Sequence, residues 1–583
     1  MLETSYRTNT CGELSEKELG KKAKLCGWIH GRRDHGGVIF IDLRDRYGLT
    51  QIVFEPKNKF FKEADKLRRE DCISILGKVR KRPKGMENKN IKTGSVEIEV
   101  AELEILNKSE VPPIEVEDRI EAGEEIRLKY RYLDLRRPVM QERLNLRHNV
   151  ITSAREFFNK NGFVEVTTPL LVKSTPEGAR DYIVPSRVNP GKFYALPQSP
   201  QIYKQILMIA GLDRYYQTAT CLRDEDLRAD RQPEHMQFDL EMSFVSSDDI
   251  RKFVEEMYKY LFKKVLNVNL KDFTVLTYKE SMERFGSDKP DMRFGLELID
   301  VTNTAKKSEF SVFKNAEKIK CINPEKDLSR KELDEYIEFC TSNGAKGMAW
   351  IRVTEKGLES SILKYLSPKI QEELLKIIKP KKNSVLMFIA DKEKIANSVL
   401  GRLRLRLRDD LQLAKNNDFK LCWVKDFPLF AWNEDENKWE PEHHMFSMPK
   451  QEYTKDFEKR PGEVIGDLWD LTLNGIELGS GSIRISSPEL QERIMKFIGL
   501  TKEEANRKFG FLLEAYKYGG PIHGGMGLGV DRLVALMAGI NDIREVIAFP
   551  KNKNAECPMD NCPSDVEDKQ LKELHIKLDL VKK

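Results

Sequence analysis

Five short β-rich segments near the N-terminus constrain the fold of the first part of the chain most strongly. They read LCGWIHGR, GVIFIDLRDR, LTQIVFEP, ISILGKVRKR and VEIEVAELEIL, and one helical segment, NKFFKEADKLRRE, lies between the third and the fourth. Five strands with a helix at this position is the plan of an OB-fold β-barrel, whose open face binds single-stranded nucleic acid. We therefore predict an OB-fold domain over residues 1–110.

The distribution of charge supports a polyanionic partner for this domain. Residues 1–110 hold 23 Lys and Arg against 18 Asp and Glu, whereas the remaining residues hold 76 of each sign. The whole positive excess of the chain, +5, therefore lies on the first domain, which fits a nucleic acid. A solvated surface with a chance excess is the alternative that charge alone leaves open.

An aromatic residue lies on the charged face of the second of these strands. In VIFIDLRD, the side chains of Ile39, Ile41 and Leu43 point one way and Phe40 points the other way. Phe40 is a candidate platform for base stacking, and one stray exposed aromatic is the alternative. The arginines near it in the pattern favour RNA: Arg32, Arg33, Arg80 and Arg82.

The rest of the chain is too long for one core and should hold further domains. The stretch after the barrel is rich in proline and charge and is interpreted as a hinge, and a helix ending at Gly162 follows it. An insert separates two stretches of mixed strands and helices. Within it, GRLRLRLRD alternates like a strand in a helix-friendly context, so the local pattern leaves both open. The expected ranges are 1–110 for the OB domain, 111–140 for the hinge, 141–287 and 419–583 for the two parts of the main domain, and 288–418 for the insert.

Composition argues against a secreted or membrane protein. No apolar run approaches the roughly 20 residues that a membrane span needs, and the N-terminus lacks the pattern of a secretion signal. Nine cysteines, an odd number, suit free thiols in a reducing cytoplasm. Cys557 and Cys562 lie too far apart for the usual zinc knuckle.

Two arginine-bearing motifs point to phosphate chemistry. RDEDLRADRQPEHMQFDLEMSF, from Arg223 to Phe244, places a densely charged loop directly before an alternating strand. Such a loop is usually a salt-bridged surface, but arginine is also the best planar binder of phosphate. In GLGVDRL, Arg532 lies in the first turn of an apolar helix, and no Walker motif is present. LNGIELGSGSIR adds Glu477 and Arg484, and a carboxylate beside such arginines makes chemical sense with Mg²⁺ between carboxylate and phosphate.

Together these motifs resemble a class II aminoacyl-tRNA synthetase, and most closely the bacterial aspartyl-tRNA synthetases. GFVEVTTPLL resembles motif 1, with Pro169 at a dimer interface; the loop from Arg223 resembles motif 2; GLGVDRLVAL resembles motif 3; TPEGARDY and QSPQIYKQ add to the match. The resemblance covers essentially the whole chain. It implies an α+β multidomain enzyme: an N-terminal OB-fold anticodon domain, an antiparallel-sheet catalytic domain and an α/β insert. It also implies a cytoplasmic homodimer.

The resemblance also implies roles for single residues. Arg223 matches the arginine that binds the α-phosphate and the substrate carboxylate, and Arg532 matches the one that holds the γ-phosphate; both are candidate catalytic residues. Lys204 and Arg484 match the cations that read the aspartate side chain. The other implied contacts are Glu225, Gln232, Glu477, Gly529, Val530 and Asp531 for ATP, Asp470 and Glu477 for Mg²⁺, and Glu177, Gln201, Asp239 and His443 for aspartate.

One position departs from the family. His235 stands where the family usually has a phenylalanine that stacks on adenine. An imidazole is smaller and can charge near neutral pH, so we expect either weaker or pH-dependent ATP binding, or stacking by a neutral ring.

In the OB domain the resemblance implies that Phe40, Gln51 and Glu99 contact the anticodon. His35 and Gly85 resemble the relaxed type of the family, which charges the asparagine tRNA as well as the aspartate tRNA; drift in two surface loops is the alternative. Two other readings of the chain stay open: an asparaginyl-tRNA synthetase-like enzyme and a non-catalytic RNA-binding paralogue. Pyrophosphate exchange with aspartate and with asparagine separates them.

Overall fold

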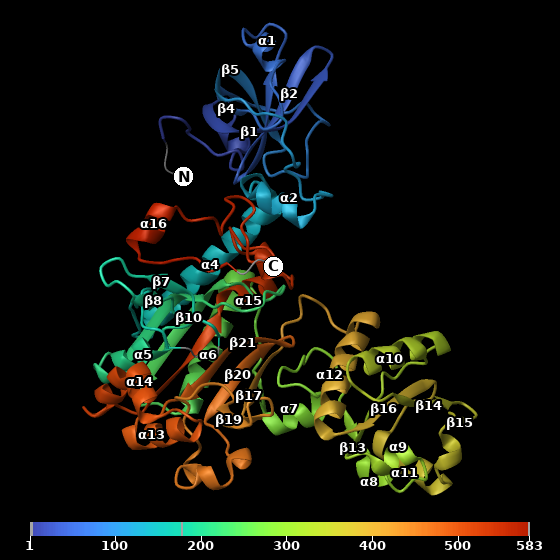
Figure 1. Ribbon diagram of the computed structural model, residues 1–583. Helices are drawn as coiled ribbons and strands as arrows, with labels where there is room; N and C mark the ends of the chain where they lie inside the picture. The colour runs from blue at the N-terminus through green and yellow to red at the C-terminus, as the bar shows by residue number, and fades with distance from the viewer. Residues whose placement is uncertain (1–3, 176–178, 581–583) are drawn as a thin grey trace. The chain divides into compact units, whose positions relative to one another are not determined.

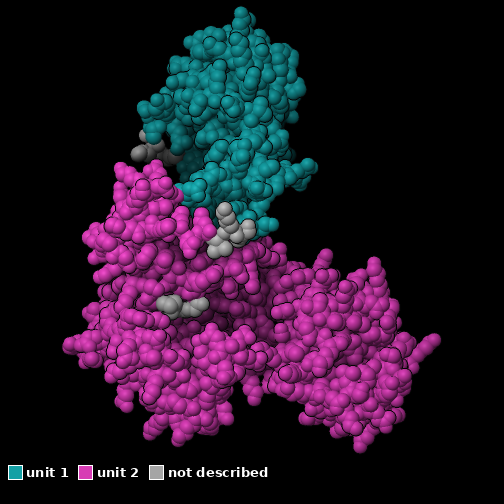
Figure 2. Space-filling model, viewed as in Figure 1, with its two compact units in different colours: residues 1–145, 544–565 teal, residues 146–543, 566–583 magenta. Residues whose placement is uncertain are grey.

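The computed structural model describes residues 4–175 and 179–580, and the chain divides into two compact units (Figure 2). Unit 1 comprises residues 1–145 and 544–565, and unit 2 comprises residues 146–543 and 566–583. The division falls within a long helix, α4 (Pro138–Lys160). Among the described residues, none of the helices combines the length and the apolar character needed to cross a membrane.

Unit 1 contains a closed five-stranded barrel with the strand order β1-β2-β3-β5-β4 (Figure 1). Ile39, Ile41 and Leu43 are fully buried in its core, as the alternation in β2 predicts. The predicted helical segment between the third and fourth strands is present but shorter than expected. The bounds are β1 (Lys22–His35), β2 (Val38–Asp45), β3 (Gly48–Phe54), α1 (Phe61–Ala64), β4 (Cys72–Lys81) and β5 (Val96–Asn107), with the 3-10 turn η1 (Glu16–Glu18) before them.

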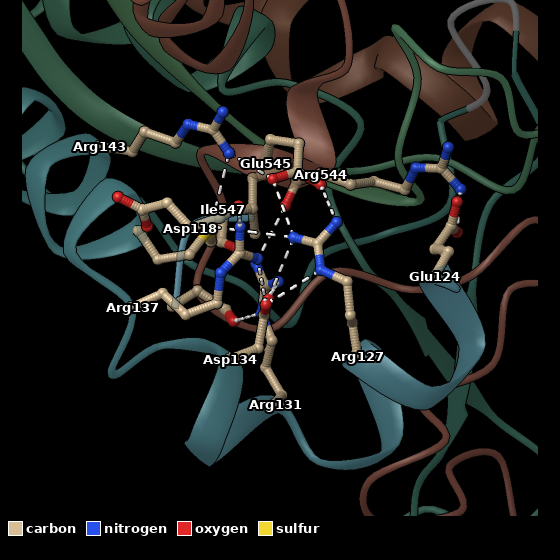
Figure 3. Close-up of polar contacts among 12 residues, drawn as sticks. Asp118, Glu124, Arg127, Arg131, Asp134, Arg137, Arg143, Arg544, Glu545 and Ile547 are labelled. Carbon is tan, nitrogen blue, oxygen red and sulfur yellow. Dashed lines mark hydrogen bonds and ion pairs between the residues drawn. The ribbon is translucent and has the colours of Figure 1, made fainter. Parts of the chain in front are cut away.

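The remainder of unit 1 is built around buried arginines (Figure 3). Asp134, whose side chain is fully buried, accepts hydrogen bonds from Arg127, Arg131 and Arg137 at 2.6–2.9 Å. Glu545 accepts from Arg127 at 2.8 and 3.0 Å and from Arg143. The elements are α2 (Glu124–Lys129), α3 (Arg131–Asp134), the start of α4 and the one-turn η6 (Ile543–Glu545). Residues from opposite ends of the sequence therefore share this hinge cluster, named here for Arg127, Arg131, Asp134, Arg137, Arg143 and Glu545.

Carbonyl groups of the C-terminal segment complete the hinge cluster. Arg131 donates to the backbone oxygens of Arg544, Ile547 and Ala548 at 2.8–3.1 Å. Burial opposes ionisation of Asp134, but the hydrogen bonds from Arg127 and Arg137 outweigh it and hold the pKa of this carboxyl below its ordinary value.

Unit 2 is organised around an eight-stranded sheet of order β11-β17-β20-β21-β22-β10-β9-β6 (Figure 1). Neighbouring strands are antiparallel except for the two edge pairs, β11 with β17 and β6 with β9. The bounds are β6 (Val164–Glu165), β9 (Arg214–Leu222), β10 (Glu234–Ser243), β11 (Thr274–Thr277), β17 (Leu421–Lys425), β20 (Leu468–Leu473), β21 (Ile476–Ile483) and β22 (His523–Gly529).

Helices and short ribbons surround this sheet. The helices are α5 (Gln201–Ile209), α6 (Ser247–Leu266), α7 (Tyr278–Phe285), α13 (Pro488–Phe497), α14 (Lys502–Tyr516), α15 (Val530–Met537) and α16 (Asp568–Glu573). The ribbons are β7 (Ile183–Pro185) with β8 (Phe193–Ala195) and β18 (Phe430–Asn433) with β19 (Lys438–Pro441), and the short turns are η3 (Gln451–Tyr453), η4 (Phe457–Lys459) and η5 (Pro461–Glu463).

The predicted insert holds a separate five-stranded sheet of order β12-β13-β16-β14-β15. Alternate residues of β16 enter two different cores, one with Met387 and one with Phe388, because helices cover both faces. The elements are β12 (Ile299–Asp300), α8 (Thr302–Ala305), α9 (Ser311–Asn315), β13 (Lys318–Ile322), α10 (Arg330–Ser342), β14 (Ala349–Thr354), β15 (Gly357–Glu359), η2 (Leu363–Tyr365), α11 (Pro368–Ile378), β16 (Ser384–Asp391) and α12 (Glu393–Asp410).

The ambiguous GRLRLRLRD stretch lies in helix α12. Val399, Leu400, Leu403 and Leu407 are buried at helical spacing, and the core they enter settles the conformation that the local alternation left open.

Candidate functional site

A cavity of about 660 Å³ in unit 2 brings together most of the residues predicted for the catalytic site. The predicted residues in its lining are Gln201, Lys204, Arg223, Glu225, Gln232, His235, Asp239, His443, Glu477, Arg484, Gly529, Asp531 and Arg532. They come from loops, strands and the helices α5 and α15, up to 331 positions apart in the chain. Glu177 lies outside the described residues.

The motif 2 loop connects β9 to β10 and carries Arg223 at its start. The backbone N–H of Arg223 donates to the carbonyl of Pro233 at 2.8 Å, which closes the base of the loop. Its guanidinium donates to the Gln198 carbonyl at a long 3.4 Å. Across the loop, Arg231 binds Glu225 at 2.9 Å. Within the described ranges, most of the five donors of Arg223 therefore stay available for a ligand in the cavity.

The second predicted phosphate-binding arginine begins the helix that follows the glycine-rich strand β22. Arg532 is the third residue of α15, and its guanidinium donates to the Glu477 carbonyl at 3.0 Å and to Asp230 at 3.2 Å. Its neighbour Asp531 binds Arg147 through one oxygen and accepts from the backbone N–H of Met236 through the other, at 2.8 Å. Both oxygens of the Asp531 carboxylate thus already bind other groups of the protein.

Val530, the other predicted ATP contact on α15, has a fully buried side chain and is absent from the cavity lining. Only its backbone remains available for the predicted role.

The environment of His235 keeps its imidazole neutral. Burial, together with the positive charges of Arg223 and Arg532, lowers the pKa of His235 to about 3. Of the two alternatives that the sequence left open, this environment favours stacking by a neutral ring, because burial and the two arginines both oppose protonation. A neutral ring is the form that can stack on a base.

Four buried charges form one cluster, and three of them, Lys204, Asp239 and Arg484, line the cavity, whereas Glu241 lies behind them. Lys204, Asp239, Glu241 and Arg484 are each at most 6 % exposed. Lys204 binds Asp239 at 2.5 Å and Glu241 at 3.1 Å, and Arg484 binds Glu241 through two nitrogens at 2.9 and 3.2 Å. Two cations and two anions balance one another, which makes their burial tolerable.

Sequence reasoning missed Glu241, although a signal for it existed. It follows Asp239 by two positions on β10, so both side chains must point to the same face. Burial opposes ionisation, but Arg484 and Lys204 outweigh it and lower the pKa of Glu241 to about 2. Glu241 therefore stays charged and orients both cations that were predicted to read the substrate side chain.

Glycines on β22 make room for these carboxylates. A Cβ at Gly525 would lie 2.1 Å from a Glu241 oxygen, and one at Gly527 would lie 3.3 Å from an Asp239 oxygen. The side chains of Glu241 and Asp239 on the neighbouring strand β10 therefore require glycines in the run HGGMGLG of β22.

The predicted metal ligands lie on two neighbouring strands, Asp470 on β20 and Glu477 on β21. Burial and the charge of Glu477 raise the pKa of Asp470 well above its ordinary value, and one Asp470 oxygen lacks a hydrogen-bond partner among the described residues. His443 approaches that oxygen to 3.9 Å. The unpartnered oxygen of Asp470 beside the carboxylate of Glu477 fits Mg²⁺, which commonly binds one or two carboxylates together with substrate phosphates.

No set of three or more potential metal ligands occurs within the described ranges. Asp470 and Glu477 are the residues that would hold the ion.

The outer face of the barrel carries the predicted anticodon residues Phe40, Gln51 and Glu99, and their contacts with RNA stay a prediction. Phe40 is partly exposed, on the face opposite the buried Ile39 and Ile41. Gln51 donates to Glu97 at 2.8 Å. Glu97 and Glu99 alternate with core residues on β5 and share this face, but Glu97 is buried and Glu99 is exposed. The period-2 pattern could have found Glu97.

The two predicted discrimination residues lie in separate loops. His35 is exposed at the end of β1, with its ring centroid 6.4 Å from that of Phe40. Gly85 has φ +86°, and a Cβ there would touch nothing within 4 Å. Its left-handed backbone alone is a reason for glycine at this turn.

Comparison with known proteins identifies the family. Residues 123–553 match the family model of class II tRNA synthetases (D, K and N). The chain belongs to the class II aminoacyl-tRNA synthetases. Residues 23–106 match a second model, the OB-fold nucleic acid binding domain, over the closed barrel. The chain is therefore a ligase of the synthetase class, as its motifs predict, with ATP as a substrate.

Curated relatives match this synthetase over nearly its whole length. The aspartate–tRNA(Asp/Asn) ligase of Caldanaerobacter subterraneus subsp. tengcongensis is 51 % identical over 583 residues, covering 98 % of each chain. The protein of the same name from Aquifex aeolicus is 49 % identical, again over 98 % of each chain.

A solved structure shows the same fold. It is the asparaginyl-tRNA synthetase of Pyrococcus horikoshii with asparaginyl-adenylate, at a TM-score of 0.58 and 21 % identity over 94 % of this chain and 98 % of the other.

Proposed function

We propose that this synthetase is an aspartate–tRNA ligase that works through aspartyl-adenylate. The observation that carries the proposal is a cavity lined by the buried Lys204, Arg484 and Asp239, with Glu241 paired to both cations behind them, and lined also by Arg223 and Arg532. Lys204 and Arg484 provide fixed cations for a side-chain carboxylate, and Arg223 and Arg532 provide guanidinium groups for phosphates. The curated relatives carry the corresponding name.

In the first step the α-carboxylate of aspartate attacks the α-phosphorus of ATP and pyrophosphate leaves. Arg223 neutralises the charge that builds on the α-phosphate, and Arg532 holds the terminal phosphate so that the leaving group is aligned with the attack. The neutral ring of His235 between these arginines can stack on adenine. Mg²⁺ bound at Asp470 and Glu477 would supply further charge neutralisation at the phosphates.

In the second step a hydroxyl at the 3′ end of the tRNA attacks the activated carbonyl and AMP leaves. Lys204 and Arg484 hold the aspartate side chain through both steps. They also account for selection: asparagine presents an NH₂ where these donors need an acceptor, and a site built on buried hydrogen-bonding groups rejects such an analogue strongly.

Pyrophosphate exchange tests the activity. Purified protein should exchange pyrophosphate into ATP with aspartate and should be at least tenfold less efficient with asparagine. Preference for asparagine would favour an asparaginyl enzyme, and no exchange with either amino acid would favour a non-catalytic RNA-binding protein.

We further propose that the enzyme charges both the aspartate and the asparagine tRNA. His35 beside Phe40 and the unobstructed Gly85 support tolerance at the third anticodon base, and the relatives' names include both tRNAs. Imidazole can donate or accept a hydrogen bond and so can meet either pyrimidine. Aspartylation of each purified tRNA by one enzyme preparation tests this; only trace charging of the asparagine tRNA would mean a strict enzyme.

We also propose that the enzyme is a homodimer of the cytoplasm. Near Pro169 of motif 1, the apolar side chains of Val164, Leu170 and Leu171 are 47–52 % exposed, which supports a protein partner at this surface. Sedimentation should give the mass of two chains, and Leu170→Asp should give that of one. Translation takes place in the cytoplasm, and nine free cysteines suit that compartment.

A further inference from the structure

Lys289 lies in the catalytic cavity although no synthetase motif assigned it a role. It belongs to the SDKPD sequence at the start of the insert. Its ammonium lies 2.8 Å from a side-chain oxygen of Glu477 and 3.8 Å from Asp288. The Lys289 side chain is 39 % exposed, so the ammonium meets both Glu477 and the solvent of the cavity.

The backbone on either side of Lys289 is held in place. The N–H of Lys289 donates to the Ser287 hydroxyl at 3.0 Å, and the carbonyl of Ser287 accepts from the Ser281 hydroxyl at 2.6 Å. Two positions on, the buried Asp291 binds Arg293 at 2.7 Å and Arg408 at 3.1 Å. Lys289 is therefore presented from a fixed turn.

Helix α12 of the insert provides much of this anchorage. Arg404, which is 1 % exposed, donates to the carbonyls of Asp291, Phe294, Gly295 and Leu296 at 2.8–3.1 Å. Where α7 ends, a Cβ at Gly286 would lie 2.2 Å from a backbone oxygen of α12. The first turns of the insert and α12 thus pack as one piece.

Lys289 and Arg532 reach the same residue from different segments. Arg532 donates to the backbone oxygen of Glu477, and Lys289 binds its side chain. Arg532 is the arginine proposed to bind the γ-phosphate. Lys289 is a second cation beside Glu477, so a polyphosphate bound by Arg532 would run between Arg532 and Lys289.

We propose that Lys289 is a further nucleotide-binding residue of this synthetase, which contacts the β- and γ-phosphates of ATP and is held in place by the insert. This inference rests on the proposed function, because it takes ATP as the nucleotide. A role as counter-ion of Glu477 alone is the competing explanation. It predicts an effect on the fold or on all nucleotides equally, whereas a phosphate contact predicts an effect only on nucleotides that carry β- and γ-phosphates.

Calorimetric binding of ATP and of AMP, each with Mg²⁺ and without amino acid, separates the two explanations. Lys289→Met should weaken ATP binding roughly 10- to 100-fold, the range for losing a hydrogen bond to a charged group, and leave AMP binding unchanged. Lys289→Arg should recover most of the ATP affinity. Lys279→Met, at an exposed lysine on α7, is the matched control and should bind both nucleotides like the wild type.

Equal weakening of ATP and AMP by Lys289→Met, or no weakening of either, would overturn the inference. Failure of Lys289→Arg to recover ATP affinity while its thermal unfolding matches the wild type would also overturn it. Failure of the proposed function looks different, since the wild type would then lack aspartate-dependent pyrophosphate exchange whatever Lys289 does.

Discussion

The neutral state of His235 leads to a quantitative expectation for the pH dependence of catalysis. With a pKa of about 3, the imidazole should stay neutral throughout the range in which the enzyme works. At pH 5.5 about 0.3 % of the rings would be protonated, whereas an ordinary pKa of about 6.5 would give about 90 %. If a protonated ring cannot stack, the two cases differ by about tenfold in the competent fraction.

Replacing His235 with phenylalanine isolates this group. The assay is aspartate-dependent pyrophosphate exchange from pH 5.5 to 8.5, from which kcat/KM for ATP is obtained; this parameter reports the ionisation of the free enzyme. Dividing the wild-type profile by the profile of His235→Phe cancels the ionisation of ATP and of every other shared group. We expect a constant ratio. A roughly tenfold fall in the ratio between pH 7.5 and 5.5 would refute the reasoning.

The same group affects stability, and the sign follows from the pKa. The folded value lies below the value of about 6.5 in the unfolded chain, so the unfolded state takes up the proton as the pH falls below about 6.5. The folded state should lose about 2 kcal/mol from this residue by pH 5, and nothing above pH 7.5. His235→Phe should therefore lose less thermal stability than the wild type between pH 7.5 and 5; equal losses would contradict the assignment.

Three further substitutions test the site. Arg223→Ala should lower pyrophosphate exchange by about 10²–10³ with unchanged thermal unfolding, since its guanidinium makes one long hydrogen bond among the described residues; near-wild-type exchange would refute its role. Arg484→Leu should abolish aspartate activation, spare ATP binding, and destabilise unit 2 by about 3–5 kcal/mol because the buried Glu241 loses its two-nitrogen partner and is left with Lys204, which Asp239 shares; adding Glu241→Gln should recover stability but not activity, and recovery of both would make Arg484 structural. Phe40→Ala should raise KM for tRNA, with a loss of about 1–3 kcal/mol for one stacked base, and leave exchange unchanged, whereas an effect on exchange would place Phe40 in the core.

Strand periodicity predicted the side-chain orientations of one strand and left the conformation of another segment undecided. It predicted that Ile39, Ile41 and Leu43 of β2 point into the barrel and that Phe40 points outward, because that barrel strand buries one face only. It left GRLRLRLRD open because alternating Leu and Arg satisfies both a strand and a helix, and the deciding fact is the core against which Leu403 and Leu407 pack.

The residues that sequence reasoning missed depend on neighbours distant in the chain. Glu241 becomes functional only because Lys204 and Arg484 converge on it, and Lys289 only because the turn at the start of the insert lies beside Glu477. The pKa of His235 likewise depends on Arg223 and Arg532, which lie on two different segments. No local pattern contains these distances, whereas the motifs themselves could be found by their order in the sequence.

Unit 1 is assembled from two stretches of chain that leave the ribosome far apart in time. The hinge arginines Arg127 and Arg143 emerge roughly 400 residues before Glu545, their buried carboxylate partner. At about 5–20 residues per second this is a wait of roughly 20–80 s, during which the barrel can close but the hinge cannot complete its ion pairs. A nascent or truncated chain that ends before Glu545 would expose those guanidinium groups, so the hinge should be the last part of unit 1 to become resistant to proteolysis during synthesis.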